Sequence, residues 1–86
     1  MKTVFLLMAE FNTAHPKLED VAPRYLGMQP AMAARAAALR TLPIPAFRLG
    51  SQKSPWLVSV TDLADCLDRA MDEARRETFG VSRRRA

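Results

Sequence analysis

The chain has 86 residues, a net charge of +4, one cysteine and one histidine. This length allows one small domain with a single core, and the single cysteine excludes an internal disulfide and a cysteine-based zinc site. With 49% hydrophobic and 26% charged residues, the composition is that of a globular protein. We expect residues 1–79 to form one domain and the basic residues 80–86 to form a flexible tail.

The first predicted element is a short helix over residues 3–12. Its Leu, Met, Ala and Glu residues favour a helix, whereas Thr3 and Val4 favour a strand. The apolar run over residues 4–9 is too short to span a membrane, and Glu10 interrupts it before any segment that resembles a signal-peptide cleavage site. We therefore expect a cytoplasmic, nucleoid-associated protein with no membrane partner.

Two short helices joined by a tight turn are predicted next. Residues 18–26 have the apolar spacing of an amphipathic helix, although Pro23 removes an amide donor, and Gly27 supplies a stop. Pro30 suits the first turn of a second, alanine-rich helix over residues 30–40. Two helices separated by a short turn that contains glycine are typical of a helix-turn-helix.

A β-hairpin is predicted after the second helix. Residues 46–49 and 56–59 have the pattern of strands, and residues 50–55 that of a polar turn with a partly basic tip. We expect the aromatic residues Tyr25, Phe47 and Trp56 in the core, with Trp56 in the core or against the last helix.

The last predicted helix starts between Ser59 and Thr61; Ser59 with Asp62 fits a capping box, and Thr61 is an alternative cap. Its apolar stripe is expected to face the core and consists of Leu63, Leu67, Ala70, Met71 and Ala74. The residues expected to face water are Asp65, Asp68, Arg69 and Asp72. Cys66, beside the stripe, is expected to be an inert buried thiol.

The order of these elements predicts an α+β, mainly α fold. It is a small winged helix-turn-helix with an N-terminal helix and a C-terminal helix, in which the hairpin forms the wing. Residues 1–60 hold seven basic and three acidic side chains, and residues 81–86 hold three arginines. Nucleic acid is a natural partner for such basic surfaces.

Three segments resemble the pyocin activator protein (PrtN-type) family of bacterial transcriptional activators. They are residues 1–12 with the opening Thr-Val-Phe-Leu-Leu-Met-Ala, residues 47–58 with Ser-Gln-Lys at the tip of the hairpin, and Asp-Leu-Ala-Asp-Cys-Leu-Asp over residues 62–68. The resemblance runs from residue 1 to about residue 77, and Pro23 and the alanine-rich second helix depart from it. It implies a protein that binds promoter DNA and activates phage-like or bacteriocin genes, on a winged-helix plan like that of excisionases and MerR-type proteins.

The candidate DNA contacts lie on the second helix and on the wing. They are Gln29, Met32, Arg35, Ala36 and Arg40 on or beside the helix, and Arg48, Ser51, Gln52 and Lys53 in the hairpin. Arginine reads guanine bidentately or clamps phosphate, and a wing holds the backbone or enters the minor groove. If Ala33 and Ala37 pack inward, Arg35 faces DNA; if Leu39 packs inward with Met32 and Ala36, Arg35 moves to the edge.

We predict a DNA-binding activator that is not an enzyme and needs no cofactor or metal, because no nucleophile–base pair or metal cluster is visible. Promoter DNA, RNA polymerase and a second copy of the chain are the expected partners. Two alternatives stay open. One is an excisionase-like protein that bends DNA, and the other is a protein-binding adaptor that retains the fold.

Overall fold

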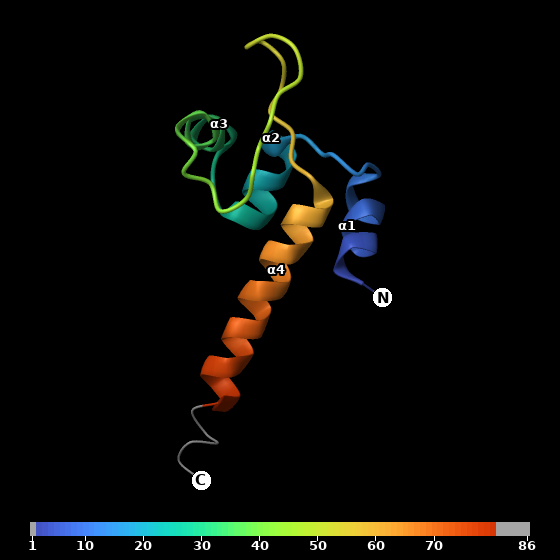
Figure 1. Cartoon of the computed structure of the whole chain (residues 1–86), viewed down its shortest axis with the longest axis vertical. Helices are drawn as coiled ribbons and strands as arrows, with labels where there is room; N and C mark the ends of the chain where they lie inside the picture. Colours follow the sequence, from blue (N-terminus) through green and yellow to red (C-terminus); the bar gives the residue numbers. More distant parts are fainter. Residues whose placement is uncertain (1, 81–86) are drawn as a thin grey trace.

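The computed structural model describes residues 2–80, which form a mainly helical fold, as predicted (Figure 1). The helices within these residues, in chain order, are α1 (Thr3–Phe11), α2 (Leu18–Val21), η1 (Ala22–Leu26), α3 (Pro30–Leu39), α4 (Val60–Arg75) and η2 (Arg76–Gly80), where η denotes a π-helical turn. None of the described helices combines the length and apolar character that a membrane span needs. Of the predicted flexible tail, Gly80 ends η2 and residues 81–86 lie outside the described residues.

The predicted first helix is confirmed as α1. It ends where Asn12 adopts a left-handed backbone (φ 57°) and donates its N–H to the Met8 carbonyl. Because α1 is apolar on most of its circumference, packing Leu7 into the core leaves Phe5 and Leu6 more than half exposed.

The predicted helix over residues 18–26 is divided into α2 and the π-turn η1. Pro23, at the start of η1, has no amide to donate to an α-helical ladder, so the chain continues through a wider turn. The predicted inward face is preserved, because Leu18, Val21 and Ala22 are buried. Gly27 ends the turn with a left-handed φ of 64°, as its predicted role requires.

The predicted second helix is α3, which packs against α2. Pro30 lies in its first turn and Arg40, with a φ of 57°, ends it. The buried residues of α3 are Ala33 and Ala37. Their small side chains let the two helix backbones approach closely, which explains why the alanine-rich sequence suits this helix.

The predicted β-hairpin is wrong in its extent, because no strand occurs within residues 2–80. Phe47 and Leu57 exchange two backbone hydrogen bonds of 2.9 and 2.7 Å, and Leu57 also bridges Lys17. Pro45 and Pro55, which lack amide donors, flank the Phe47–Leu57 pair and prevent a longer ladder. Residues 48–55 therefore form a loop, and Figure 1 shows it projecting beyond α3.

The core gathers buried residues from α1, α2, α3, the start of α4 and the segment that precedes α4, and α1 packs directly on α4. Its largest fully buried side chains are Leu18, Val21, Val58, Val60 and Leu63. Ser59 caps α4 by accepting from the Thr61 N–H at 3.2 Å. The expected inward stripe holds only for the first half of α4, because every residue from Asp68 to Phe79 is exposed. Figure 1 shows the second half of α4 running away from the body.

The aromatic residues lie at the edge of the core rather than inside it. Tyr25 and Trp56 are half-buried and pack against the core, and Phe47 is half-buried with its ring edge-on to His15. Cys66 is a half-buried free thiol packed against the core, so its predicted burial is only partial. The largest fully buried side chains of the core are leucines and valines, and Tyr25 and Trp56 pack around them.

Candidate nucleic-acid interface

The structure decides which face of α3 points outward. Ala33 and Ala37 are buried, and Met32, Arg35 and Leu39 are exposed. The first of the two predicted helix phases is therefore correct. Within residues 2–80, no ion pair engages Arg35, so its guanidinium is available to a partner.

An apolar groove runs along the outer face of α3. It has a volume of about 310 Å³ and is lined by Met28, Met32, Arg35, Ala36, Leu39 and Thr41. Met32 is 62% exposed and Leu39 is 67% exposed. The predicted residues Met32, Arg35 and Ala36 thus lie together, whereas Met28 and Leu39 were missed. The spacing of seven residues between Met32 and Leu39, which places them on one side of a helix, was the signal available for Leu39.

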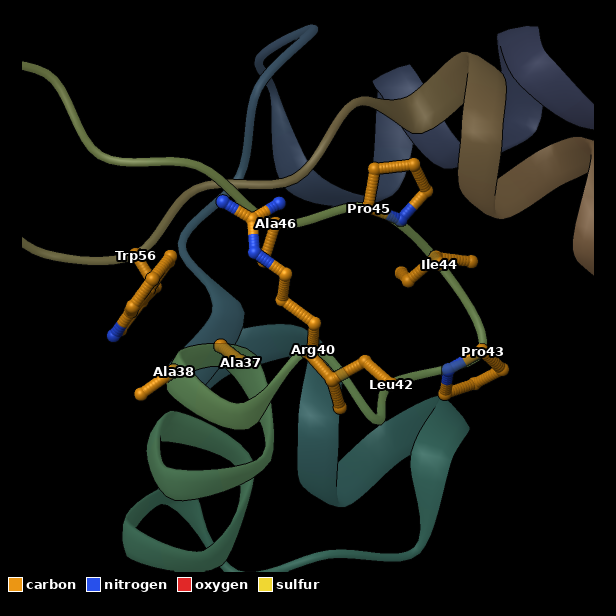
Figure 2. Close-up of a pocket in the computed structure, with 9 residues that line it drawn as sticks. All are labelled: Ala37, Ala38, Arg40, Leu42, Pro43, Ile44, Pro45, Ala46 and Trp56. Carbon is orange, nitrogen blue, oxygen red and sulfur yellow. The ribbon is translucent and has the colours of Figure 1, made fainter.

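Arg40 lies apart from that outer face. Its left-handed backbone ends α3, and its side chain extends into a cleft of about 410 Å³ between α3 and residues 42–46. Figure 2 shows the guanidinium reaching toward Ala46, with Trp56 on the far side of the cleft. The structure therefore does not bring Arg40 together with Met32 and Arg35.

The loop over residues 48–55 is held in shape by its own contacts. The Arg48 guanidinium stacks 4.2 Å from the Trp56 ring centroid and donates to the Gln52 carbonyl at 2.6 Å. Ser51 accepts from the Lys53 N–H at 3.2 Å. Arg48 therefore supports the loop, while the exposed Gln52 and Lys53 side chains lie at its tip.

The loop and the first half of α3 share a groove of about 300 Å³. Pro30 and Ala34 of α3 form one side, and Arg48, Gln52 and Trp56 form the other. Glu19 of α2 also lines this groove, so its electrostatic character is mixed. Gln29 immediately precedes α3 and is exposed, with no capping hydrogen bond from its side chain. The first-turn amides of a helix have no intrahelical partner and attract anions.

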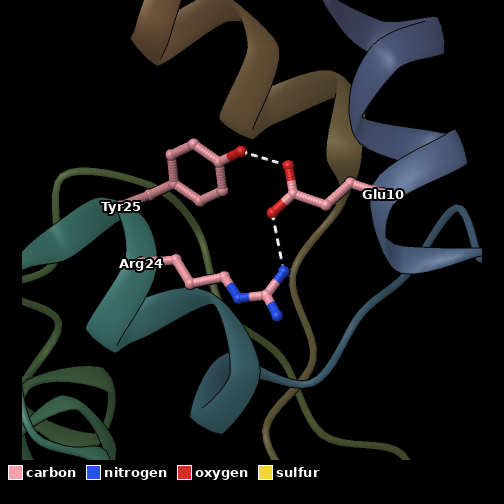
Figure 3. A network of polar contacts seen from close by, with 3 residues as sticks. All are labelled: Glu10, Arg24 and Tyr25. Atoms are coloured by element: carbon pink, nitrogen blue, oxygen red, sulfur yellow. Dashed lines mark hydrogen bonds and ion pairs between the residues drawn. The ribbon is translucent and has the colours of Figure 1, made fainter.

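A polar network that the sequence analysis missed fixes α1 against η1 (Figure 3). The Glu10 carboxylate accepts from the Arg24 guanidinium at 2.8 Å and from the Tyr25 hydroxyl. The Tyr25 hydrogen bond, followed by that of Arg24, lowers the pKa of Glu10 below its ordinary value. The same hydrogen bond raises the pKa of Tyr25. The Arg24 guanidinium is therefore engaged in an intramolecular ion pair with Glu10, away from the candidate interface.

The Glu10→Gln variant is expected to lose the stability that this network contributes at neutral pH. A carboxylate whose folded pKa is lowered stabilises the protein above its unfolded pKa of about 4.3 and loses that contribution as pH falls through the folded pKa. Urea unfolding should therefore show the wild type more stable than Glu10→Gln at pH 7, with the gap closing in acid. Glu73→Gln, which removes an exposed carboxylate from α4, serves as the control. A gap that stays constant with pH would contradict the assigned role.

Comparison with known proteins identifies one related family. A family model described as "Pyocin activator protein PrtN" matches residues 3–74. No curated protein and no solved structure shows significant similarity to the chain. The matched region includes α1, α2, α3, the loop over residues 48–55 and nearly all of α4.

Proposed function

We propose that this chain, which belongs to the pyocin activator protein PrtN family, acts as a sequence-specific DNA-binding protein at the promoters of pyocin genes. Membership of this family supports a role in activating those genes. In this proposal α2, η1 and α3 act as a helix-turn-helix, and α3 enters the major groove. The loop over residues 48–55 serves as a short wing, and RNA polymerase is the further partner that activation requires. The single observation that carries the proposal is the outward Arg35 at the centre of the exposed face of α3, which has no ion-pair partner within residues 2–80.

The dimensions and chemistry of α3 support this role. A helix fits the major groove, where arginine pairs bidentately with guanine and apolar side chains contact thymine methyl groups. Arg35 lies between Met32 and Leu39 on one face, so one arginine and two apolar side chains meet base edges together. The buried Ala33 and Ala37 hold this face outward by packing against α2.

The loop supports the second contact. Lys53 and Gln52 lie at its exposed tip, and the Arg48–Trp56 stack holds that tip beside the start of α3. A lysine in this position attracts phosphate without reading sequence, and a helix start offers free amides to the same strand. The proposal thus assigns sequence reading to α3 and the backbone contact to Lys53, with Arg48 as a supporting residue.

A second candidate function follows from the groove formed by Met28, Met32 and Leu39. Exposed methionines are common on surfaces that bind apolar protein segments, and this groove is mostly apolar. A protein-binding adaptor would use the same face of α3 and would show no salt-dependent affinity for DNA. DNA binding measured over a salt series therefore separates the two functions.

The test is a mobility shift with promoter DNA from neighbouring operons, over a series of salt concentrations and with scrambled DNA of equal length as competitor. We expect specific binding that weakens steeply as salt rises, because each phosphate contact releases counterions. Lys53→Ala should weaken binding to all sequences alike and reduce the salt slope by about one. A folded protein that fails to bind at low salt would refute the proposal and favour the adaptor.

A further inference from the structure

The loop over residues 48–55 exposes a large apolar side chain that the fold does not use. Leu49 is 69% exposed. Within residues 2–80, the core and the hydrophobic residues packed against it include Ala46 and Trp56, which flank the loop, but not Leu49. A single exposed leucine is common on protein surfaces, so the meaning of this one depends on how the loop presents it.

Leu49 lies on an ordered part of the loop. The residue before it, Arg48, stacks on Trp56 and donates to the Gln52 carbonyl at 2.6 Å. The residue after it, Gly50, turns the chain with a left-handed φ of 88°, which glycine adopts without strain. Because one neighbour is anchored and the other sets a defined turn, a partner that binds Leu49 pays little to order the loop.

The groove between the loop and α3 indicates where Leu49 is directed. Arg48 and Gln52 line that groove and Leu49 does not, so the Leu49 side chain is directed away from it. In the proposed binding mode, α3 occupies the major groove and Lys53 contacts the strand backbone beside it. The minor groove borders the same backbone on its other side. The loop projects beyond α3 (Figure 1), so Leu49 lies where the loop can meet the minor groove.

The chemistry around Leu49 fits DNA as the partner. Residues 21–61 contain five basic and no acidic side chains, and Gln52 and Lys53 are exposed on the same loop. Proteins that bind the minor groove use basic and amide side chains for its polar edges, and they frequently insert a leucine or another apolar side chain between two base pairs. The loop carries one exposed side chain of each kind.

We propose that Leu49 is a wedge that enters the minor groove and bends the DNA toward α3. This inference rests on the proposed function, because it needs α3 in the adjacent major groove. Insertion partly unstacks one base step, and the duplex kinks toward its major groove. The kink brings the DNA closer to α3 and to Lys53, and the added contacts offset the lost stacking. The protein then shapes the promoter as well as recognising it.

The test measures the bend in the promoter duplex that the protein binds, by energy transfer between dyes at its two ends. The wild type is expected to bend this DNA by about 20–90°, the range of apolar wedges. Leu49→Ala should lose most of the bend, whereas Leu49→Met, which keeps a long apolar side chain, should retain it. Leu6→Ala is the matched control, because it truncates a leucine that is 54% exposed on α1. Saturating protein keeps a change in affinity from being read as a change in bend.

A mobility shift with the same variants separates this inference from the proposed function. A folded wild type that does not bind at low salt would overturn both. A wild type that binds without bending, or a Leu49→Ala complex bent as strongly as the wild type, would overturn the wedge and leave DNA binding by α3 intact. Loss of the bend in Leu6→Ala as well would place its cause outside the loop, and the wedge would again be wrong.

Discussion

Replacing Arg35 with alanine is expected to weaken binding to promoter DNA by about 1–3 kcal/mol, which is roughly 5- to 150-fold in Kd. The reason is geometric: Arg35 is the central exposed side chain of α3, and no ion pair within residues 2–80 occupies it. Removing the Arg35 side chain leaves the major-groove edge of the contacted base pair without a hydrogen-bond partner. The fold should be unchanged, because Arg35 projects from the surface. Competitive mobility shift at one fixed salt concentration measures the effect.

Arg69→Ala is the matched control for Arg35→Ala. It removes one positive charge from an exposed helical position on α4, paired with Asp65 at 3.1 Å, and should leave DNA affinity nearly unchanged. Arg35→Lys separates the two ways in which an arginine binds. It retains a charge for phosphate but loses the planar fork that reads guanine. Equal losses for the Arg35 and Arg69 alanine variants would show that α3 does not contact DNA.

Replacing Leu63 with alanine is expected to lower the free energy of unfolding by about 2–5 kcal/mol. Leu63 is 1% exposed and lies in α4 among the buried residues that join this helix to the body. The substitution removes apolar contacts and leaves a cavity that the short surrounding helices can fill only in part. A domain of this size has about 5–15 kcal/mol of stability in total, so the substitution should remove a large fraction of it.

Leu49→Ala is the control for the effect of Leu63→Ala. Leu49 is 69% exposed and lies in the loop, so its truncation should change stability by less than about 0.5 kcal/mol. Urea unfolding followed by circular dichroism and by Trp56 fluorescence measures both variants at one protein concentration, because self-association would otherwise shift the midpoints. Similar midpoints for the two variants would contradict the placement of Leu63 in the core.

The helices were predictable because their signals are local. Pro30 at the first turn of α3, Gly27 with its left-handed backbone and the cap at Ser59 act through neighbouring residues. The division of the second predicted helix was not predictable in detail. Pro23 signals a missing hydrogen bond, but it does not say whether the helix ends there or widens into the π-turn η1, which keeps Val21 and Ala22 buried.

The hairpin shows where local reasoning fails. The alternation of residues 46–49 and 56–59 favours strands, yet only Phe47 and Leu57 pair, and Leu57 uses its other side to bridge Lys17. Pairing depends on which segments meet across the fold, and the prolines near this pair limit how far it extends. The Glu10–Arg24–Tyr25 network was missed for a related reason, since its members are far apart along the chain and meet only when α1 packs near η1.

The sequence by itself determined the family, the mainly helical class, the turn between the two central helices and the inward face of the first of these helices. These properties follow from short-range propensities and from a motif order that the family match confirms. Only the tertiary structure decided that Ala33 and Ala37 face inward, that Arg40 turns into its own cleft and that the distal half of α4 is left uncovered. An apolar stripe has the same periodicity whether or not a neighbour covers it. Burial is a property of contacts between segments, which helical periodicity does not encode.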